Sequence, residues 1–471
     1  MNWGLGDIVE ATGGRLLYGE PRQCFEGIGI DSRTVAPGSL FVAIRGATHD
    51  AHKFLPQVVA KGIRGLVVQE QTGIILDHDA WKAQGTACVA VKDTTRALGA
   101  LAAFQRQRMR IPLVAVTGSN GKTTTRRMIA LVLAQRYKTL TTEGNFNNEI
   151  GLPLTLFRLT REHQAAVVEL GINHPGEMDR LGAICKPTVA VFTNVGPAHL
   201  EFLGSVQGVA RAKGELLPHI DPKGYAVLNM DDEHVAALAK LASCSTLFFG
   251  TAPEADVRAE SIVDGPGGIT FRLILPDDRM DIHLPTPGRF MVYNALAAAA
   301  SGYLSNLKTA EIKAGLEKFR PVQGRLNITT AANGVHIIDD TYNANPASMA
   351  AAIDTFVVSK GAARGFMVLG DMLELGPQAD VLHYRVGELA ANAGVEKLYA
   401  CGDHAEDVLA GARHKGMAAR QLAAASKEEI ERDLIRILEP GDWLLEGLAR
   451  HGHGAGGGSG QPLGPGGCRR S

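Results

Sequence analysis

Short continuous runs of apolar, often β-branched residues recur along the chain, separated by segments with helical spacing. Such runs, unlike the alternating pattern of a half-exposed strand, are typical of strands buried on both faces of a parallel sheet. The helical segments between them predict crossover connections, so the pattern as a whole favours an α/β fold. The predicted strands lie at residues 65–68, 114–116, 165–170, 189–194, 225–229, 335–340, 365–370 and 397–401.

The predicted elements fall into three blocks. Residues 1–107 hold short strands and helices, including a predicted helix at 54–61. Residues 108–316 carry the longest β/α alternation and predict a central parallel sheet covered on both faces. Residues 317–445 repeat the alternation and predict a doubly wound, Rossmann-like unit.

The composition narrows the class of protein. With 471 residues and 45% hydrophobic content, the chain can bury several cores. A net charge of -1 gives no basic surface for nucleic acid or anionic membranes. Six scattered cysteines indicate a reducing compartment, and neither a signal segment nor an 18-residue apolar run is present in the sequence. We therefore expect a cytoplasmic protein that binds neither nucleic acid nor membranes.

Residues 117–124, Thr-Gly-Ser-Asn-Gly-Lys-Thr-Thr, lie between the strand at 114–116 and a helical pattern at 128–133. A strand, a glycine-rich turn and a helix N-terminus in this order form a phosphate-binding loop. In such a loop Lys122 would neutralise terminal phosphates and the Thr123 hydroxyl would bind Mg²⁺. The alternative is a glycine turn with a surface lysine. The predicted nucleotide-binding residues here are Gly118, Ser119, Asn120, Gly121, Lys122, Thr123 and Thr124.

Polar side chains follow several strands, at the sheet edge where open α/β sheets bind ligands. Glu169 ends one apolar run, and its carboxylate could hold Mg²⁺ near Thr123, or be a solvated glutamate. His199 comes just past another strand and could equally be a loop or capping histidine. Lys213 lies in a predicted helix, where most lysines are solvated.

Two segments, at 144–151 and 339–346, are rich in asparagine. Amides both donate and accept hydrogen bonds and so suit a sugar or peptide ligand, although turn-rich loops have the same composition. Arg325 follows Gly324 at the start of the third block. It could reach a phosphate and respond to domain closure, or be a surface arginine.

Taken together, these segments resemble the Mur ligase family, the ATP-dependent amide ligases of peptidoglycan precursor synthesis. The resemblance covers about residues 26–445. It rests on the phosphate loop, the loop at 144–151, Asn-Ala-Leu-Ala-Ala at 294–298 and Gly-Arg at 324–325. Two further segments, at 339–346 and 369–376, resemble the member that adds D-alanyl-D-alanine to a UDP-linked muramoyl tripeptide.

The resemblance implies a monomer with a small UDP-substrate domain, a central ATP-binding domain and a C-terminal Rossmann-like domain. It implies ATP and two Mg²⁺ ions as cofactors. One Mg²⁺ would be held by Thr123 and Glu169, the other by His199 and by Lys213 carrying CO₂ as a carbamate. The residues implied as catalytic are Lys122, His199 and Lys213, and those added to the nucleotide site are Asn294, Arg325 and Asp340.

The substrate contacts implied by the resemblance come from all three blocks. In the first, Asp50-Ala51-His52 replaces the family's Asp-Gly-His. Residues 288–294 also depart from the family's Gly-x-His-Asn-x-x-Asn, so only Asn294 is carried over. The implied substrate-binding residues are Ser32, Arg33, Asp50, His52, Asn145, Asn147, Asn148, Tyr342, Asn343 and Asn345.

Two alternatives remain. One is a related ligase with a different amino-acid substrate, either another Mur ligase or an enzyme like folylpolyglutamate synthase. The other is a nucleotide-binding protein made inactive by its altered C-terminus.

The tail at residues 446–471 departs from the family. Its last 21 residues contain nine glycines, too many for a helix or a buried face. Read one base out of frame, codons for residues 446–457 can encode Lys-Gly-Ser-Arg-Gly-Met-Gly-Met-Glu-Arg-Val, which is the ending that the family has. We therefore predict a single-base frameshift near codon 446, the alternative being a natural linker. Resequencing the 3′ end of the gene distinguishes the two.

Overall fold

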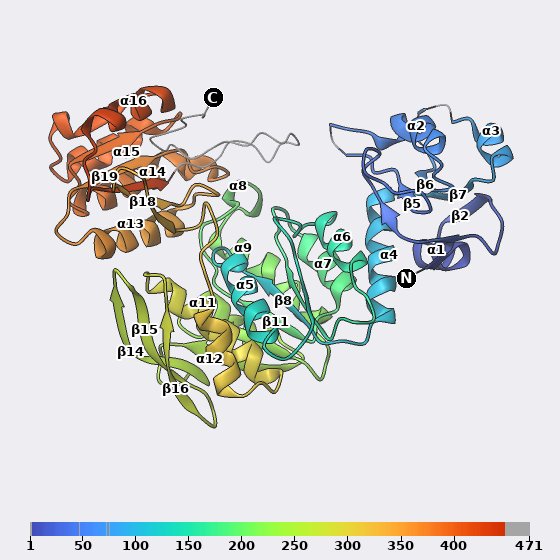
Figure 1. The fold of residues 1–471 in the computed structure, drawn as a ribbon, viewed down its shortest axis with the longest axis horizontal. Helices are drawn as coiled ribbons and strands as arrows, with labels where there is room; N and C mark the ends of the chain where they lie inside the picture. The colour runs from blue at the N-terminus through green and yellow to red at the C-terminus, as the bar shows by residue number, and fades with distance from the viewer. Residues whose placement is uncertain (1, 47, 72, 75, 448–471) are drawn as a thin grey trace.

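The computed structural model describes residues 2–46, 48–71, 73–74 and 76–447. The predicted frameshifted tail lies outside these residues, except for Glu446 and Gly447. The described chain forms three successive α/β units, as Figure 1 shows, which confirms the predicted fold class. We propose domain boundaries at 107/108 and 316/317, each within one residue of the end of a helix.

The N-terminal unit is built on a five-stranded sheet in the order β2-β7-β6-β5-β4, with a separate two-stranded ribbon, β1-β3. Strands β4 to β7 are parallel, and β2 runs antiparallel to β7. Its strands are β1 (Trp3–Gly4), β2 (Arg15–Tyr18), β3 (Cys24–Phe25), β4 (Ile28–Gly29), β5 (Leu40–Val42), β6 (Gly65–Gln69) and β7 (Ala87–Val91). Its helices are α1 (Leu5–Thr12), η1 (Ala51–Phe54), α2 (Leu55–Ala60), α3 (His78–Ala83) and α4 (Thr94–Arg108).

The central unit has a nine-stranded sheet in the order β16-β15-β14-β13-β12-β11-β8-β10-β9. Its strands are β8 (Leu113–Thr117), β9 (Thr139–Thr141), β10 (Ala165–Glu169), β11 (Val189–Phe192), β12 (Tyr225–Asn229), β13 (Ser245–Gly250), β14 (Val257–Gly265), β15 (Gly268–Ile274) and β16 (Arg279–Leu284). Strands β9 to β14 and β8 are parallel, and β14, β15 and β16 form an antiparallel meander at one edge. Buried apolar residues cover both faces of the sheet, as the continuous apolar runs predict.

The helices of the central unit lie between its parallel strands and after the meander. They are α5 (Lys122–Leu133), α6 (Gly151–Phe157), α7 (Glu177–Cys185), α8 (Leu200–Leu203), α9 (Val206–Gly214), η2 (Leu217–His219), α10 (Glu233–Ala237), η3 (Leu238–Leu241), α11 (Phe290–Leu304) and α12 (Thr309–Glu317). Among the described residues, no helix is long and apolar enough to cross a membrane.

The C-terminal unit has a six-stranded sheet in the order β17-β18-β22-β19-β20-β21, parallel except for β17. Its strands are β17 (Asn327–Thr330), β18 (His336–Asp339), β19 (Gly365–Leu369), β20 (Lys397–Ala400), β21 (Leu422–Ala424) and β22 (Trp443–Gly447). Its helices are α13 (Pro346–Lys360), η4 (Gly376–Gln378), α14 (Ala379–Asn392), α15 (Ala405–His414), η5 (Ala419–Gln421) and α16 (Lys427–Ile437).

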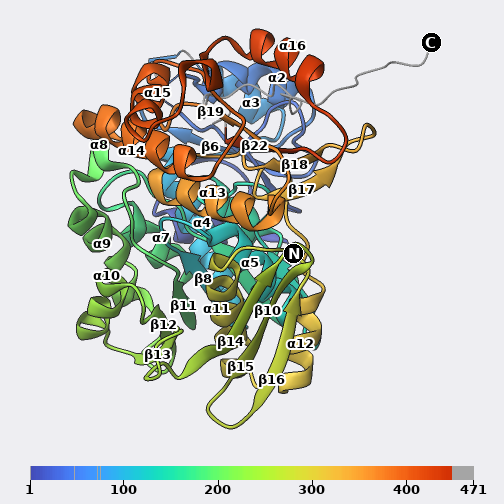
Figure 2. The same cartoon turned by 90° about the vertical axis from the view of Figure 1, so that its left-hand side faces the viewer.

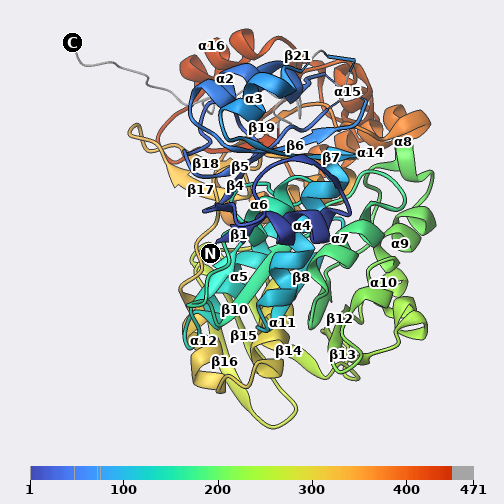
Figure 3. The same ribbon diagram turned by 90° about the vertical axis from the view of Figure 1, so that its right-hand side faces the viewer.

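The N-terminal and C-terminal units stand apart over the same side of the central unit (Figures 1, 2 and 3). Helix α8 is the part of the central unit that lies beside α14 of the C-terminal unit in these views. The space between central and C-terminal units therefore holds the ends of strands from both sheets.

Candidate active-site cleft

A cleft of about 1790 Å³ lies between the central and C-terminal units. Its walls include the phosphate loop, the asparagine-rich loop and the segment after β11 from the central unit. The C-terminal unit contributes the segments around Arg325, Asn345 and Glu374. The cleft thus joins segments that are up to about 250 residues apart in sequence, all at strand ends.

The two glycines of the phosphate loop are required by its backbone and by its neighbours. Gly118 has a φ of +151° and Gly121 a φ of +77°, a range that favours glycine. A Cβ on Gly118 would lie 1.9 Å from Thr193 Oγ1, and one on Gly121 would lie 2.5 Å from Asn294 Oδ1. The loop is therefore packed against both neighbours without room for a side chain.

The segment after β11 fixes the loop by hydrogen bonds. The backbone N–H of Ser119 donates to Asn194 O (2.9 Å), and that of Asn120 donates to Asn194 Oδ1 (2.8 Å). Asn120 O accepts from Thr193 Oγ1 at 2.6 Å. Since two loop amides are engaged in this way, the amides that face a phosphate here are those of the first turn of α5, which lack intrahelical acceptors.

Lys122 begins α5 and folds back over the loop. Its Nζ donates to the carbonyls of Gly118 (2.8 Å) and Ser119 (3.0 Å). Burial, opposed by Glu169 and reinforced by the charge of Arg325, lowers the pKa of Lys122 to about 8. The lysine is therefore held as a cation without a direct carboxylate partner, ready to exchange two carbonyls for an anion.

Glu169 ends β10, is 2% exposed, and is the centre of a polar cluster. Its Oε2 accepts from Thr123 Oγ1 at 2.9 Å, and its Oε1 accepts from Asn147 Nδ2 at 2.9 Å. Arg126 Nε lies 3.3 Å from Oε2, an ion pair without hydrogen-bond alignment. The carboxylate and hydroxyl oxygens of this cluster are hard donors of the kind that Mg²⁺ prefers.

His199 and Lys213 flank the cleft from consecutive helices. His199 precedes α8 with a φ of +54°, and its Nδ1 is hydrogen-bonded to the carboxylate of Glu374. Lys213 on α9 is 2% exposed, and burial together with the charge of Lys122 holds its pKa well below the usual value. Among the described residues, no group of three or more His, Cys, Asp or Glu side chains could hold a metal ion. The predicted second metal site thus needs a modified Lys213.

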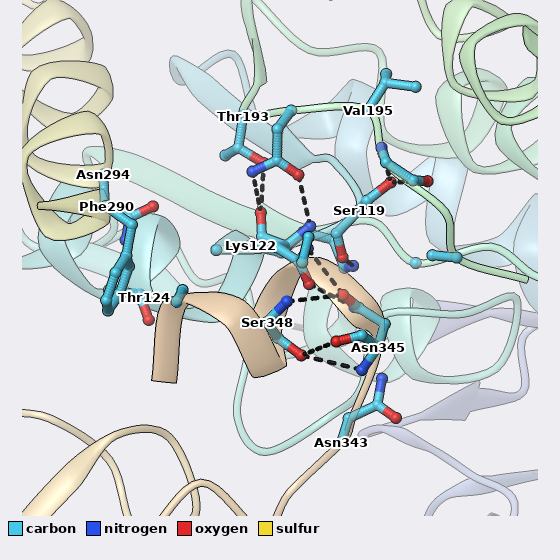
Figure 4. A pocket seen from close by; sticks show the side chains of 18 of the residues that line it. Ser119, Lys122, Thr124, Thr193, Val195, Phe290, Asn294, Asn343, Asn345 and Ser348 are labelled. Atoms are coloured by element: carbon cyan, nitrogen blue, oxygen red, sulfur yellow. Dashed lines mark hydrogen bonds between the residues drawn. The ribbon is translucent and has the colours of Figure 1, made fainter. Parts of the chain in front are cut away.

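The C-terminal unit touches the phosphate loop directly through an amide pair. Asn345 Nδ2 donates to Asn120 Oδ1 (2.6 Å), and Asn120 Nδ2 donates to Asn345 Oδ1 (3.2 Å). Asn345 also caps α13, because its Oδ1 accepts from Ser348 N at 2.9 Å. Figure 4 shows Asn345 and Ser348 facing the loop around Ser119 and Lys122. The start of α13 is therefore attached to the phosphate loop.

Replacing Asn345 with alanine is expected to destabilise the protein by about 1–2 kcal/mol, since it removes both the helix cap and the amide pair. Serine at this position keeps the cap and loses only the pair. Urea unfolding of the two variants, each with and without Asn120→Ala, separates the two contributions. The Asn120 substitution should cost less in either Asn345 variant than in the parent; equal costs in all backgrounds would mean that the pair contributes nothing.

Arg325 and Asp340 line the C-terminal wall of the cleft, as does Tyr342. The Arg325 guanidinium lies 4.1 Å from the centre of the Tyr342 ring, in a cation–π contact. Asp340 is 8% exposed and accepts from Leu326 N at 3.2 Å. Burial raises the pKa of Asp340 to about 7. Both charged groups are thus held at the cleft by the C-terminal unit itself.

The raised pKa of Asp340 predicts a pH-dependent stability. The folded protein binds a proton here that the unfolded chain releases near pH 4, so this group's contribution is lost as the pH rises to about 7. Asp340→Asn should therefore unfold at higher urea than the parent at pH 8, by on the order of 1–4 kcal/mol, and match it near pH 4. Asp354→Asn, an exposed aspartate on α13, is the control. A difference independent of pH would contradict the argument.

The asparagine-rich loop lines the cleft opposite α13, but its members have different contacts. Asn145 is exposed, Asn147 holds Glu169, and Asn148 Oδ1 accepts from Gly151 N (2.9 Å) at the start of α6. Asn294 on α11 is 5% exposed and accepts from Thr125 Oγ1 at 3.0 Å. Asn343 also lines the cleft and, with Asn145, is the member best placed to meet a ligand there.

The predicted residues of the N-terminal unit are not part of this cleft. Arg33 is exposed and paired with Asp31 (2.7 Å), and the carbonyl of Ser32 accepts from Lys61 Nζ (2.7 Å). His52 is fully buried: its Nδ1 bonds Asp50 (2.6 Å), and its Nε2 accepts from Gln69 N (2.9 Å). In this structure His52 therefore joins two loops of the unit and does not meet solvent.

Two residues of the cleft were not predicted from the sequence. Arg126, at 5% exposure, would have needed the positions of Glu169 and Thr141 to be recognised. Glu374 lies within the 369–376 segment that carries part of the family resemblance, which was the available signal. Its partner, His199, is 175 residues away.

Comparisons with known proteins agree on one family. Three family models match: "Mur ligase family, catalytic domain" at residues 25–106, "Mur ligase middle domain" at 116–302 and "Mur ligase, glutamate ligase domain" at 324–446. The UDP-N-acetylmuramoyl-tripeptide–D-alanyl-D-alanine ligase of Escherichia coli (strain K12) is 39% identical over 374 residues, covering 79% of this chain and 80% of that one.

Two solved structures extend the similarity to the fold. A crystal structure of MurF from Acinetobacter baumannii is 34% identical with a TM-score of 0.86, covering 95% of this chain and 96% of that one. MurF ligase from Thermotoga maritima in complex with ADP is 26% identical with a TM-score of 0.78, covering 90% and 94%.

Proposed function

Because the chain belongs to the Mur ligase family, we propose that it joins D-alanyl-D-alanine to UDP-N-acetylmuramoyl-tripeptide at the expense of ATP. The product is the UDP-linked pentapeptide of peptidoglycan synthesis, formed with ADP and phosphate. The observation that carries the proposal is the cleft in which the phosphate loop, Glu169 and His199 of the central unit meet Arg325 and Asn345 of the C-terminal unit.

The reaction would proceed in two steps. The terminal carboxylate of the tripeptide attacks the γ-phosphorus of ATP, the bond to the β-phosphate oxygen breaks, and an acyl phosphate and ADP form. The amine of D-alanyl-D-alanine then attacks the acyl carbon, phosphate leaves, and the amine loses a proton. Lys122 and the first-turn amides of α5 would hold the phosphates, and closure of the cleft would keep water from the acyl phosphate.

The nucleotide site would take Mg²⁺, whose charge offsets that of the phosphates during transfer. Thr123 and Glu169 would hold one ion, since their oxygens already lie together. His199 and Lys213 would hold the second, with Lys213 as a carbamate. The burial and low pKa of Lys213 support this assignment, because CO₂ reacts with the neutral amine.

The remaining predicted contacts are part of the same proposal. Asn294 would lie on the nucleotide side, and Arg325 and Asp340 would reach the nucleotide from the C-terminal unit. Peptide and sugar groups would contact Asn145, Asn147, Asn148, Tyr342, Asn343 and Asn345, and the UDP end would contact Ser32, Arg33, Asp50 and His52. We also propose a cytoplasmic monomer, supported by the five free thiols of the described residues.

The test is ADP release with UDP-linked tripeptide, measured with and without D-alanyl-D-alanine. We expect release that depends on the dipeptide and a pentapeptide product on mass spectrometry. Release with single amino acids in place of the dipeptide would indicate another ligase of the family. Nucleotide binding without ADP release would indicate an inactive nucleotide-binding protein.

We also propose the single-base frameshift near codon 446. Glu446 is 1% exposed and pairs in register with the buried Asp339 on the neighbouring parallel strand, so two acids lie level inside one sheet. The alternative frame places lysine at 446, a cation that would offset the charge of Asp339. An uninterrupted gene would refute the proposal; a restored frame should raise both the stability and the activity of the protein.

A further inference from the structure

The loop after β19 crosses from the C-terminal unit to the central unit. The Glu374 carboxylate is hydrogen-bonded to His199 Nδ1, and the Glu374 carbonyl accepts from Glu201 N at 3.2 Å. Two residues on, Gly376 packs so closely that a Cβ there would lie 3.4 Å from the Glu201 backbone. The segment at 374–376 thus rests on the beginning of α8, beside which α14 lies in Figures 1 to 3.

Both partners of this contact have an unfavourable backbone. His199 has a φ of +54° and Glu374 a φ of +59°, in the left-handed region that residues with side chains rarely adopt. Each conformation persists only because its surroundings impose it, and such residues cluster at functional sites. Here two of them, from different units, hold each other's side chains.

The loop that carries Glu374 is fixed to its own unit. Buried His383 accepts from Met372 N through Nε2 (2.8 Å), and its Nδ1–H donates to Ala379 O (2.6 Å). Asp371 Oδ1 and Oδ2 accept from the backbone N–H groups of His404 (3.0 Å) and Asp403 (2.9 Å). Glu374 is therefore placed by the C-terminal unit as a whole, and it reaches His199 only when that unit is docked.

A carboxylate that accepts Nδ1–H of a histidine fixes the ring's tautomer and orientation and leaves Nε2 as the available ligand atom. This is the usual partner of a metal-binding histidine, but here it comes from the opposite unit. We propose that Glu374 is a positioning residue that orients His199 for the second metal ion, so that docking of the C-terminal unit completes that metal site. The proposal rests on the metal role of His199 in the proposed function.

The test is Mn²⁺ binding to the ADP-bound protein, followed by electron paramagnetic resonance, together with ATP and Mg²⁺ dependence of the rate. Glu374→Ala should weaken the second Mn²⁺ site about 10- to 100-fold and lower kcat, with partial recovery at high Mg²⁺ and little change in KM for ATP. Glu374→Gln, which can still accept Nδ1–H, should recover part of the affinity. Glu201→Ala removes an exposed carboxylate from the same junction and should match the parent.

A double variant separates positioning from mere docking. If Glu374 acts through His199, adding Glu374→Ala to His199→Ala should cause no further loss of Mn²⁺ affinity. Unchanged Mn²⁺ affinity in Glu374→Ala, or full additivity in the double variant, would overturn the proposal. A parent protein with no second Mn²⁺ site or no ligation would instead refute the proposed function, so the two failures are distinguishable.

Discussion

Replacing Lys122 with methionine is expected to lower the ligation rate by about a thousandfold, while the fold stays intact. The Lys122 ammonium has only two backbone carbonyls as printed partners, at 2.8 and 3.0 Å, so its removal leaves no buried carboxylate bereft of its main partner. What is lost is a cation beside the phosphoryl group in a cleft where water is restricted. ADP release measures the rate, and thermal unfolding checks the fold.

Lys240→Met provides the matched control, because Lys240 is an exposed lysine of the same unit. It should ligate at the parental rate. A Lys122→Met protein with the parental rate would exclude the proposed role of the phosphate loop in catalysis.

The same lysine predicts how nucleotide affinity varies with pH. Burial lowers the Lys122 pKa to about 8, so the ammonium of the empty enzyme is lost as the pH rises through that value. Bound phosphates favour the charged form, which means that binding becomes weaker above pH 8. Calorimetric titration with ADP should show this decline in the parent and a flat profile in Lys122→Met.

Lys213→Ala is expected to reduce ligation by about 10²- to 10³-fold, because it removes the atom on which the second metal ligand would be built. Lys213 is 2% exposed and is held near Lys122, so an unmodified ammonium there would be doubly unfavourable. Labelled bicarbonate should give a carbamate carbon resonance in the parent and none in the variant. Removing CO₂ should lower the parental rate reversibly.

Lys240→Ala again serves as the control and should keep both the resonance and the rate. A fully active parent without the resonance would exclude the carbamate while leaving the ligase proposal standing. A fully active Lys213→Ala protein would exclude any role of this side chain in the second metal site.

Much of the central unit could be predicted because its signals are local. The apolar run before residue 117 and the glycines after it specify a strand and a turn, and the structure has β8 and α5 there. The antiparallel meander β14 to β16 was not predicted. Its strands alternate buried and exposed positions, and their place beside β13 depends on tertiary pairing.

The candidate site divides along the same line. Glu169 could be selected because it ends an apolar strand, and the structure brings it to Thr123. His52 was selected by resemblance, yet it is fully buried and bonded to Gln69 N. Glu374 has no local signature, because its significance lies in a partner across the cleft. Sequence reasoning identifies groups on one chain segment better than contacts between units.

The separation of the N-terminal unit from the cleft has a consequence for substrate selection. Ser32 and Arg33 lie on a unit that stands apart from the phosphate loop (Figure 1), whereas the reacting carboxylate must come to Lys122. A ligand gripped at both places is measured by its length. We expect the enzyme to work as a ruler, refusing a precursor one residue short because its end cannot reach the phosphate, even when every local contact is available.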